Sequence, residues 1–386
     1  MKRSTNRILT SHVGSLVRPL DIVEMLPKRS RGEPYDKAKW DARLREAVDE
    51  VVGQQAEAGI DLINDGEFSK PMFADYIADR LNGYEGQNTS PDRFVNNTRR
   101  PDPFPGFSAW RDTQPNAFAI MRRPLCIGPL SWKERAYETD IKNLKDAMSK
   151  VNVEEGFLPS PSPGILAARI PNQYYKSEEE YLYALADVLH DEYKAITDAG
   201  LVLQIDAPDA AMCWDRQQFD TIADFRATTD LRTAALNHAL RDVPEEMIRF
   251  HVCWGNNESP HTNDVELKDI VDIVLKVKAR CYSIEAANPR HAHEWEVWQT
   301  VKLPEGKSLM PGVIDSLTNF VEHPDLVAQR IVTYANLVGR ENVIAGVDCG
   351  FGTGASANPR VHPELVWAKF RALSEGARRA SAKLWS

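Results

Sequence analysis

The sequence predicts an α/β fold of the (β/α)8, or TIM barrel, class, and three observations support this prediction. Eight short β-type runs recur along the 386-residue chain, and helical patterns separate them. Most of the runs are apolar throughout, as expected of parallel strands that helices cover. No glycine-rich nucleotide loop follows the first run, which favours a barrel over the alternative, a doubly wound sheet. The runs are RILTSHVG, IDLINDGE, GFLPSPS, LVLQIDAP, RFHVCWG, CYSIEAANP, SLMPGVID and VIAGVDCG.

Two predicted helices illustrate the pattern between the strands. Residues 42–58 repeat apolar side chains at helical spacing. Ser177 and Glu180 form a capping-box pattern that opens a second helix. Each helix ends in Ala-Gly directly before a strand, which is a common glycine-terminated connection. The apolar stripes consist of Leu44, Ala47, Val48, Val51, Val52 and Ala56 in the first helix and of Leu182, Leu185, Leu189 and Ile196 in the second.

One segment does not fit a minimal barrel. Residues 83–132 are polar and proline-rich, and they end in one more apolar run, RRPLCIGPLSW. We interpret this segment as an excursion between strands 2 and 3, a hairpin and loop that lies over the active face. A flexible surface insertion is the alternative. With this excursion included, residues 1–386 are expected to form a single barrel domain.

Composition narrows the classes of partner. The net charge of −9 argues against nucleic acid or an anionic membrane as the main partner. No apolar run approaches about 20 residues, so no membrane-spanning segment is expected. The five cysteines are few, odd in number and widely spaced, which indicates reduced thiols in the cytoplasm rather than a disulfide framework. The sequence leaves a homo-oligomer open.

The run RFHVCWG carries a histidine and a cysteine two residues apart. Alternate residues of a strand point to the same face, so His251 and Cys253 project together. In isolation this pair is more often a buried thiol beside a core histidine. However, Glu285 ends the next predicted strand and Cys349 ends the last one. Strand ends of a barrel meet at one rim, and one imidazole, two thiolates and one carboxylate suit Zn²⁺, so we predict a zinc site.

Seven short motifs, taken in order, give the chain a resemblance to a known family. They are HVGS, DGE, LQIDAP, HVC, SIEA, PGVID and DCG. With these motifs the chain resembles the catalytic barrel of the cobalamin-independent methionine synthases and their single-barrel relatives, from Ile8 to about Arg371. The resemblance implies a zinc ion held by the four residues already chosen, which are His251, Cys253, Glu285 and Cys349.

The resemblance also implies two small-molecule partners, a thiol such as homocysteine and an alkyl donor. Contacts to the thiol substrate map onto Ser15, Glu67 and Asp206. Two carboxylates that face a cavity are suitable partners for a substrate ammonium group, whereas ion pairing at the barrel rim is the alternative. We expect Asp206 and Glu67 to act in catalysis as well. His12 is a candidate catalytic acid, and Trp254 is a candidate substrate contact.

Two departures from the family's pattern bear on the alkyl donor. The methionine synthases carry Asp-Glu-Pro where this chain has Asp206-Ala207-Pro208. They also carry a histidine, thought to protonate the folate leaving group, where this chain has Leu317. Either the donor is not a folate or another group supplies the proton, and the candidates for that group are His12, His261, His291 and His293.

Three hypotheses about function follow from these residues. The first is a zinc-dependent methyltransferase that moves a methyl group from a 5-methyltetrahydrofolate-type donor to homocysteine. The second keeps the zinc site and changes the electrophile, as in the epoxide:coenzyme M transferases. The third belongs to another class, a non-catalytic, zinc-stabilised accessory protein that binds a thiol or a methyl group.

Overall fold

The computed structural model describes residues 1–86, 88, 102–113, 123–217 and 219–386, and a parallel barrel forms its centre. Eight strands pair in the order β1-β10-β9-β8-β7-β6-β5-β2, and a parallel bridge between Ser11 and Leu62 joins the two edges. Each strand overlaps one of the eight predicted runs, so the predicted barrel is confirmed. The strands are β1 (Leu9–Thr10), β2 (Leu62–Ile63), β5 (Glu155–Pro161), β6 (Val202–Asp206), β7 (Ile248–Val252), β8 (Cys281–Ile284), β9 (Ser308–Ile314) and β10 (Ile344–Val347).

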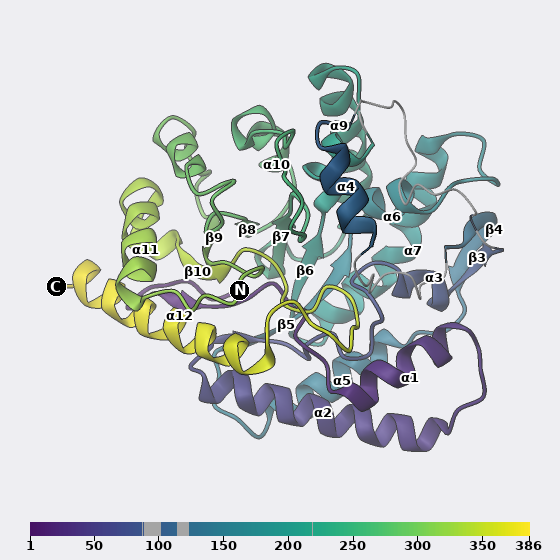
Figure 1. Cartoon of the computed structure of the whole chain (residues 1–386), viewed down its shortest axis with the longest axis horizontal. Helices are drawn as coiled ribbons and strands as arrows, with labels where there is room; N and C mark the ends of the chain where they lie inside the picture. Colours follow the sequence, from purple (N-terminus) through teal and green to yellow (C-terminus); the bar gives the residue numbers. More distant parts are fainter. Residues whose placement is uncertain (87, 89–101, 114–122, 218) are drawn as a thin grey trace.

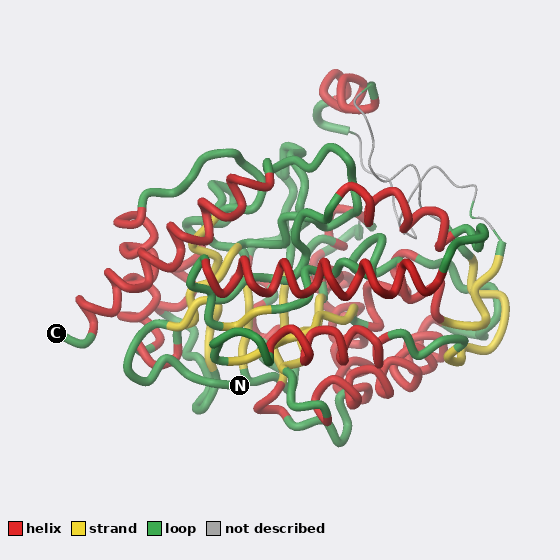
Figure 2. Tube along the Cα trace, turned by 90° about the horizontal axis from the view of Figure 1, so that it is seen from below, coloured by secondary structure: helices red, strands yellow, loops and turns green. Residues whose placement is uncertain are grey.

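Helices cover the outside of the barrel, as Figures 1 and 2 show from two directions. The connection after β7 contains only a short α-helix, and the connection after β8 contains a 3-10 helix over Glu294–Gln299. Long loops therefore surround the ends of these two strands. The helices of the described residues are α1 (Leu20–Ser30), α2 (Lys37–Glu57), α3 (Tyr76–Arg80), α4 (Pro105–Asp112), α5 (Tyr137–Met148), α6 (Pro163–Arg169), α7 (Glu178–Asp198), α8 (Cys213–Arg216), α9 (Ile222–Ala239), α10 (Val271–Val274), α11 (Pro324–Val338) and α12 (Pro363–Leu384).

The two helices predicted in detail are present. α2 begins five residues before the predicted start, at Lys37 instead of residue 42, because the Asp36 side chain accepts a hydrogen bond from the Lys39 N–H at 3.0 Å and caps the helix there. In α7, Ser177 accepts from the Glu180 N–H at 3.1 Å, as predicted. The glycines that follow the two helices have the left-handed backbone that such endings need, with φ of +80° at Gly59 and +81° at Gly200.

The excursion between the second and third barrel strands contains a two-stranded antiparallel sheet. It pairs β3 (Leu81–Glu85) with β4 (Leu125–Trp132), and the Tyr84 hydroxyl lies 2.8 Å from the Tyr181 hydroxyl of α7. The hairpin part of the prediction is therefore confirmed. Residues 87, 89–101 and 114–122 of the predicted loop lie outside the described residues. The position of this segment over the active face stays a prediction.

Gly312 allows β9 and β10 to approach closely at the carboxyl rim. A Cβ atom at Gly312 would lie 2.0 Å from Asp348 Oδ1 and 2.8 Å from the backbone N and Cα atoms of Asp348. Because two of these are backbone atoms, they cannot rotate away. We expect Gly312→Ala to lower the free energy of unfolding by about 3 kcal/mol.

The matched control is Gly53→Ala in α2, where a Cβ would meet nothing within 4 Å. This control should raise the free energy of unfolding by about 0.5–1 kcal/mol, because alanine is the better helix former. Denaturant titration of the two variants measures both effects, and equal stabilities would contradict the close-approach argument.

Candidate metal centre and neighbouring carboxylates

Strand register brings the predicted site residues to one rim of the barrel. Parallel pairing places Asp206 of β6 beside His251 of β7, and His251 beside Ser283 of β8. Glu285 follows β8 directly, and Cys349 follows β10 after one intervening residue. The carboxyl ends of barrel strands form the face on which active sites of this fold lie.

Three of the four predicted metal ligands form a compact cluster. Single ligand atoms of His251, Cys253 and Cys349 all lie within 4.8 Å of one another. The two sulfur atoms are 3.6 Å apart. His251 Nδ1 is hydrogen-bonded to the Ser283 hydroxyl at 3.0 Å, whereas the other ring nitrogen, Nε2, is buried and has no hydrogen-bond partner. A buried ring nitrogen without a partner beside two sulfurs is what a metal ligand requires.

The electrostatics of the cluster fit a zinc ion. Burial, reinforced by the charge of Arg249, lowers the pKa of His251 to about 3, so the imidazole is neutral and can donate a lone pair. The neighbouring Cys349 sulfur and burial raise the pKa of Cys253 well above its ordinary value. The two sulfurs therefore need a cation before both become thiolates. One neutral imidazole and two thiolates are a suitable donor set for Zn²⁺.

Glu285, the fourth predicted ligand, is not among the clustered atoms. Its Oε1 atom accepts a hydrogen bond from the Trp254 N–H at 2.9 Å. Its Oε2 atom accepts from Asn288 Nδ2 at 2.9 Å and from the Arg290 guanidinium at 2.8 Å. The structure thus brings three predicted ligands together and holds the fourth carboxylate in a separate set of hydrogen bonds.

Asp348, the residue before Cys349, organises the loop that follows Glu285. Its carboxylate accepts from the backbone N–H groups of Ala286, Ala287 and Asn288 at 2.7–2.8 Å, and also from Asn288 Nδ2. Burial and the nearby Glu285 charge raise the pKa of Asp348 to about 6. The sequence marks Asp348 as a polar strand end, but its function as an anchor for the neighbouring loop depends on the folded structure.

Glu67 and Asp206 form a pair of buried carboxylates. Both side chains are buried, and Asp206 Oδ1 accepts from Gln204 Nε2 at 2.7 Å. Burial and the Glu67 charge raise the pKa of Asp206 well above its ordinary value, and burial raises the pKa of Glu67. Glu67 Oε2 has no hydrogen-bond partner, and the residue has a positive φ of 59°, a strained backbone for a residue other than glycine. Such a pair suits a cationic group such as an ammonium.

Arg249 is a fully buried cation below the cluster, and the sequence analysis did not single it out. Its guanidinium donates to Gln204 Oε1 at 2.7 Å, to the Ser11 hydroxyl at 2.7 Å and to the His12 carbonyl at 3.0 Å. Gln204 in turn donates to Asp206. Arg249 therefore links β7 to the strands that carry the predicted substrate contacts. A charged residue two positions before His251, on the same face of the strand, was the available signal.

Ser15 lies against the loop that follows Cys349. Its carbonyl accepts from the N–H groups of Phe351 and Gly352 at 2.8 and 3.1 Å. A Cβ atom at Gly350 would lie 1.9 Å from the Ser15 hydroxyl oxygen, so the side chain packs directly on that glycine. The N-terminal loop and the Cys349 loop are thus adjacent, as the predicted thiol site requires.

The contacts of His12 favour a structural role over the expected catalytic one. Its Nδ1 atom accepts from the Gly14 N–H at 3.2 Å, and its Nε2 atom lies 2.7 Å from Gln55 Oε1. Burial lowers the pKa of His12 to about 3. With both nitrogens engaged and no proton to spare at neutral pH, His12 is poorly suited to act as an acid.

Trp254 also has contacts that differ from the substrate role expected of it. Its indole N–H donates to the Val265 carbonyl at 2.6 Å, and its ring lies on the His291 ring with the centroids 4.4 Å apart. Trp254 is buried, and these two contacts hold its side chain. The residue contributes to the site through its backbone N–H, which donates to Glu285.

The loop after β9 contains Leu317, the residue that stands in place of the family's histidine. The Asp315 carboxylate accepts from the Leu317 N–H at 3.0 Å and from the Thr318 hydroxyl at 2.6 Å, which fixes the loop. Asn256 accepts from the Ser316 hydroxyl at 3.1 Å and donates to the Gly350 carbonyl at 2.6 Å. Asn256, which the sequence analysis did not single out, therefore joins three loops at the rim.

Two of the histidines considered as acids, His261 and His291, share one carboxylate behind the site. Both contact Asp264, and the His291 ring also contacts Glu294 at 2.9 Å. Burial lowers the pKa of His291, but the hydrogen bonds to Asp264 and Glu294 outweigh burial and raise it to about 9. His291 is therefore a buried cation at neutral pH, which Trp254 covers.

The charge on His291 predicts a pH-dependent contribution to stability. The pKa in the folded protein, about 9, is above the ordinary value of 6.5, so the contribution is complete below about pH 6.5 and is lost as the pH rises through 9. We expect His291→Gln to lower the free energy of unfolding by about 3 kcal/mol at pH 6 and by much less at pH 10. Urea titrations at the two pH values measure this difference. The exposed neighbour His293, changed to glutamine, is the control, and a loss that does not vary with pH would contradict the assignment.

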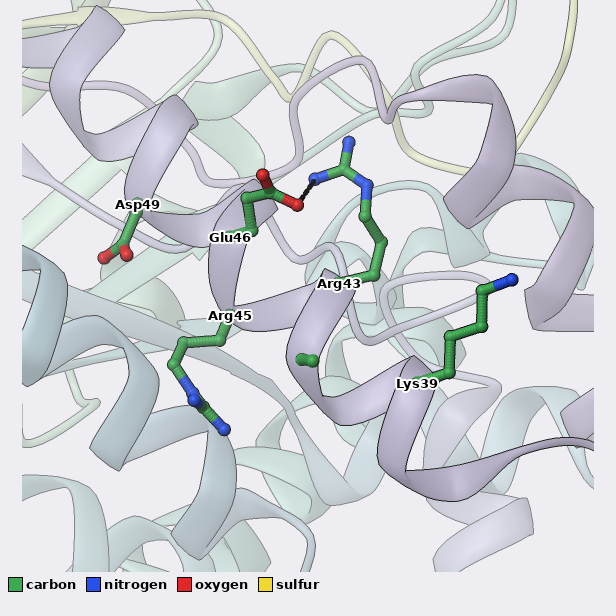
Figure 3. A pocket seen from close by; sticks show the side chains of 6 residues that line it. Lys39, Arg43, Arg45, Glu46 and Asp49 are labelled. Atoms are coloured by element: carbon green, nitrogen blue, oxygen red, sulfur yellow. Dashed lines mark hydrogen bonds and ion pairs between the residues drawn. The ribbon is translucent and has the colours of Figure 1, made fainter.

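A hollow on the protein surface is lined by side chains that form ordinary ion pairs, and it adds no site. Figure 3 shows a hollow on the outer face of α2, lined by Lys39, Ala42, Arg43, Arg45, Glu46 and Asp49. Arg43 and Glu46 are ion-paired at 3.4 Å, as is common on an exposed helix.

Among the helices of the described residues, none combines the length and the apolar character needed to span a membrane.

The structure is a (β/α)8 barrel with a cluster of His251, Cys253 and Cys349 at its carboxyl rim. A family model described as the catalytic domain of cobalamin-independent synthases matches residues 119–363, which is more than half of the chain. The chain therefore belongs to this family, and the resemblance inferred from its motifs is confirmed.

Individual relatives and solved structures match most of the chain. The chain is 23% identical over 367 residues to the uncharacterized protein YxjH of Bacillus subtilis (strain 168), covering 93% of this chain and 91% of that protein. It is 23% identical over 342 residues to a methionine synthase of Thermococcus kodakarensis, covering 88% and 86% of the two chains. Among solved structures, a B12-independent methionine synthase from Shewanella sp. W3-18-1, in complex with selenomethionine, superposes with a TM-score of 0.73 at 20% identity, covering 98% of this chain and 99% of that one. The two proteins share the fold.

Proposed function

We propose that the chain is a zinc-dependent transferase that moves a methyl group to a small thiol, with homocysteine as the thiol and a 5-methyltetrahydrofolate-type molecule as the donor. One observation carries the proposal. The cluster of His251, Cys253 and Cys349 lies at the barrel rim, and the buried carboxylate of Asp206 stands beside His251 on the neighbouring strand. Family membership and the methionine synthases among the relatives support the same reaction class.

The three clustered residues would hold the metal, and Glu285 remains the predicted fourth ligand. A free thiol has a pKa near about 8.5 and is mostly protonated at neutral pH. A bound zinc ion would supply the positive charge that keeps the substrate sulfur deprotonated and nucleophilic. The protein prepares His251 to bind the metal: Ser283 orients its ring through a hydrogen bond, and burial keeps the ring neutral.

The carboxylates of Asp206 and Glu67 would bind the substrate ammonium group. Gln204, held by Arg249, orients the Asp206 carboxylate. A bound ammonium relieves the repulsion between the two carboxylates, so the pair selects an amino-acid thiol over a thiol without an amine. Holding the substrate by its amine also places its sulfur at a fixed distance from the cluster, which is how proximity accelerates the transfer.

In the transfer itself, the substrate sulfur forms a bond to the methyl carbon while the bond from that carbon to the donor's leaving atom breaks. A folate nitrogen that leaves in this way needs a proton. Leu317 has none to give, His12 is buried with a pKa of about 3, and the protonated His291 ring is held between Asp264 and Glu294. This observation favours keeping a second candidate, in which the same thiol attacks a different electrophile, such as an epoxide.

A matrix of donors and thiols tests the proposal. Zinc-loaded protein is mixed with homocysteine or coenzyme M and with 5-methyltetrahydrofolate, other methyl donors or an epoxide, and the alkylated thiol is measured by mass spectrometry. We expect methionine from homocysteine, with little product from coenzyme M. Product from an epoxide alone would favour the second candidate. The absence of alkylated thiol in every combination would overturn the transferase assignment.

A further inference from the structure

We propose that Arg18 is a positioning residue that fixes the distance between the predicted ammonium site at Glu67 and the loop that carries Cys349. In this account the fixed distance decides which amino-acid thiol fits, so that homocysteine is selected over cysteine, which is shorter by one methylene group. The inference rests on the proposed function, because it assumes that Glu67 binds the substrate amine and that the metal cluster binds the substrate sulfur.

The guanidinium group of Arg18 joins two loops through their backbones. The residue is 4% exposed, and its terminal nitrogens donate to the Glu67 carbonyl at 3.0 Å and to the Gly352 carbonyl at 2.6 Å. Burial lowers the pKa of Arg18 to about 10, so the group still carries its charge at neutral pH. A planar cation with several N–H groups in fixed directions suits a bridge between two acceptors. This one side chain therefore ties the Glu67 loop to the Cys349 loop.

The backbone at Glu67 is strained, and Arg18 is one of the two groups that hold it. Glu67 has a φ of 59°, which is unfavourable for a residue other than glycine. Its carbonyl accepts from the Lys70 N–H at 3.0 Å as well as from Arg18. The side chain that this backbone directs has a buried Oε2 atom without a partner, which is free for a substrate amine. Loss of the Arg18 bond should therefore change where the Glu67 carboxylate points.

The segment that precedes Arg18 packs against both loops. The Leu16 N–H donates to the Gly66 carbonyl at 3.1 Å, next to Glu67. On the other side, a Cβ atom at Gly352 would lie 2.3 Å from the Leu16 carbonyl oxygen, so the two backbones are in direct contact. The N-terminal segment is thus a spacer with one loop on each side, and the Arg18 side chain connects those loops to each other.

A fixed spacing has a consequence for the substrate. In homocysteine two methylene groups lie between the sulfur and the carbon that carries the amine, whereas cysteine has one. When the amine is held at Glu67 and the sulfur must reach the metal cluster, a rigid spacing fits only one of these lengths. One methylene group is worth about 10- to 200-fold in such discrimination. Without the Arg18 bridge the two loops become free to adjust, and the preference should decline.

Titration of the cobalt-substituted protein tests the inference without turnover, because a thiolate that binds cobalt adds an absorption band. The dissociation constants of homocysteine and cysteine are measured for the wild type, for Arg18→Met and for Arg18→Lys, which keeps the charge and loses the planar fork. We expect the wild type to prefer homocysteine by at least about 10-fold and both variants by less than about threefold, mainly because homocysteine binds more weakly. Arg3→Met is the matched control. Its guanidinium contacts Asn342 before the start of β10, at the opposite end of the barrel, so the wild-type preference should remain.

A thiol without the amine separates positioning from general damage to the fold. 4-Mercaptobutanoate is homocysteine without its amine, so its binding should change by less than about threefold in Arg18→Met. Gly352→Ala, which disturbs the same contact and keeps Arg18, should lower the preference as well. An unchanged preference in the Arg18 variants, or equal weakening of all three thiols, overturns the role of Arg18. A wild-type protein whose bound metal takes up no thiol would instead overturn the proposed function.

Discussion

Replacing Cys253 or Cys349 with serine should weaken zinc binding by more than about 100-fold and abolish methyl transfer, because a serine hydroxyl stays protonated where a thiolate ligand is required. The two sulfurs are 3.6 Å apart, so each variant leaves a single sulfur beside His251. The remaining ligands, one imidazole, one thiolate and the predicted Glu285 carboxylate, should hold zinc much less tightly than the full set. Metal analysis after dialysis, at about one zinc per wild-type chain, measures the loss directly.

Cys126→Ser is the matched control for both cysteine variants. Cys126 lies on β4, outside the barrel, and its sulfur contacts the Gly128 carbonyl at 3.7 Å. The same chemical exchange at this position should leave zinc content and activity unchanged. Full zinc content in Cys253→Ser and Cys349→Ser alike would show that these sulfurs are not the ligands.

The variants Asp206→Asn and Glu67→Gln should weaken thiol binding and stabilise the ligand-free protein at the same time. Each carboxylate has a raised pKa in the folded state, so its charged form is disfavoured there. Stability from such a group is greatest at low pH, and it falls as the pH rises from the ordinary carboxylate range toward the raised value. A neutral amide removes this penalty, and we expect a gain of about 1 kcal/mol at pH 7.

The functional cost should appear in the KM for homocysteine. Losing a charged partner of the ammonium group should raise KM by about 10- to 100-fold, while a thiol that lacks the amine should be affected much less. Thermal melts across pH 5–8 and KM values for both thiols separate the two effects. A variant that loses stability at pH 7, or that loses both thiols equally, would show that the carboxylates have a structural role.

Much of the fold could be predicted because the sequence patterns that indicate it are local. Most of the eight strands lie in continuous apolar runs, and Gly59 and Gly200 mark helix ends through their backbone alone. The start of α2 was missed because Asp36 caps the helix about two turns before its predicted apolar stripe begins at Leu44. The pairing of β3 with β4 was indicated only by the apolar run at its second strand, since a long segment separates the two.

The candidate site was predictable where strand periodicity decides it. His251 and Cys253 share a face, and Cys349 joins them because barrel closure brings strand ends together. Trp254 lies two residues beyond the end of β7, so its packing on His291 depends on the folded structure. The hydrogen bonds of His12 could not, because Gln55 reaches it from a helix 43 residues away. Likewise, the hydrogen bonds that fix the loop after Glu285 come from Asp348, far along the chain.

Zinc X-ray absorption with and without homocysteine tests the central claim most directly. The wild-type protein should show two sulfur ligands from Cys253 and Cys349, and addition of homocysteine should raise the number to three as the substrate sulfur binds. Asp206→Asn should need more homocysteine to reach the same spectrum. An unchanged sulfur number at saturating homocysteine would contradict the account, because the thiol would then react without binding the metal.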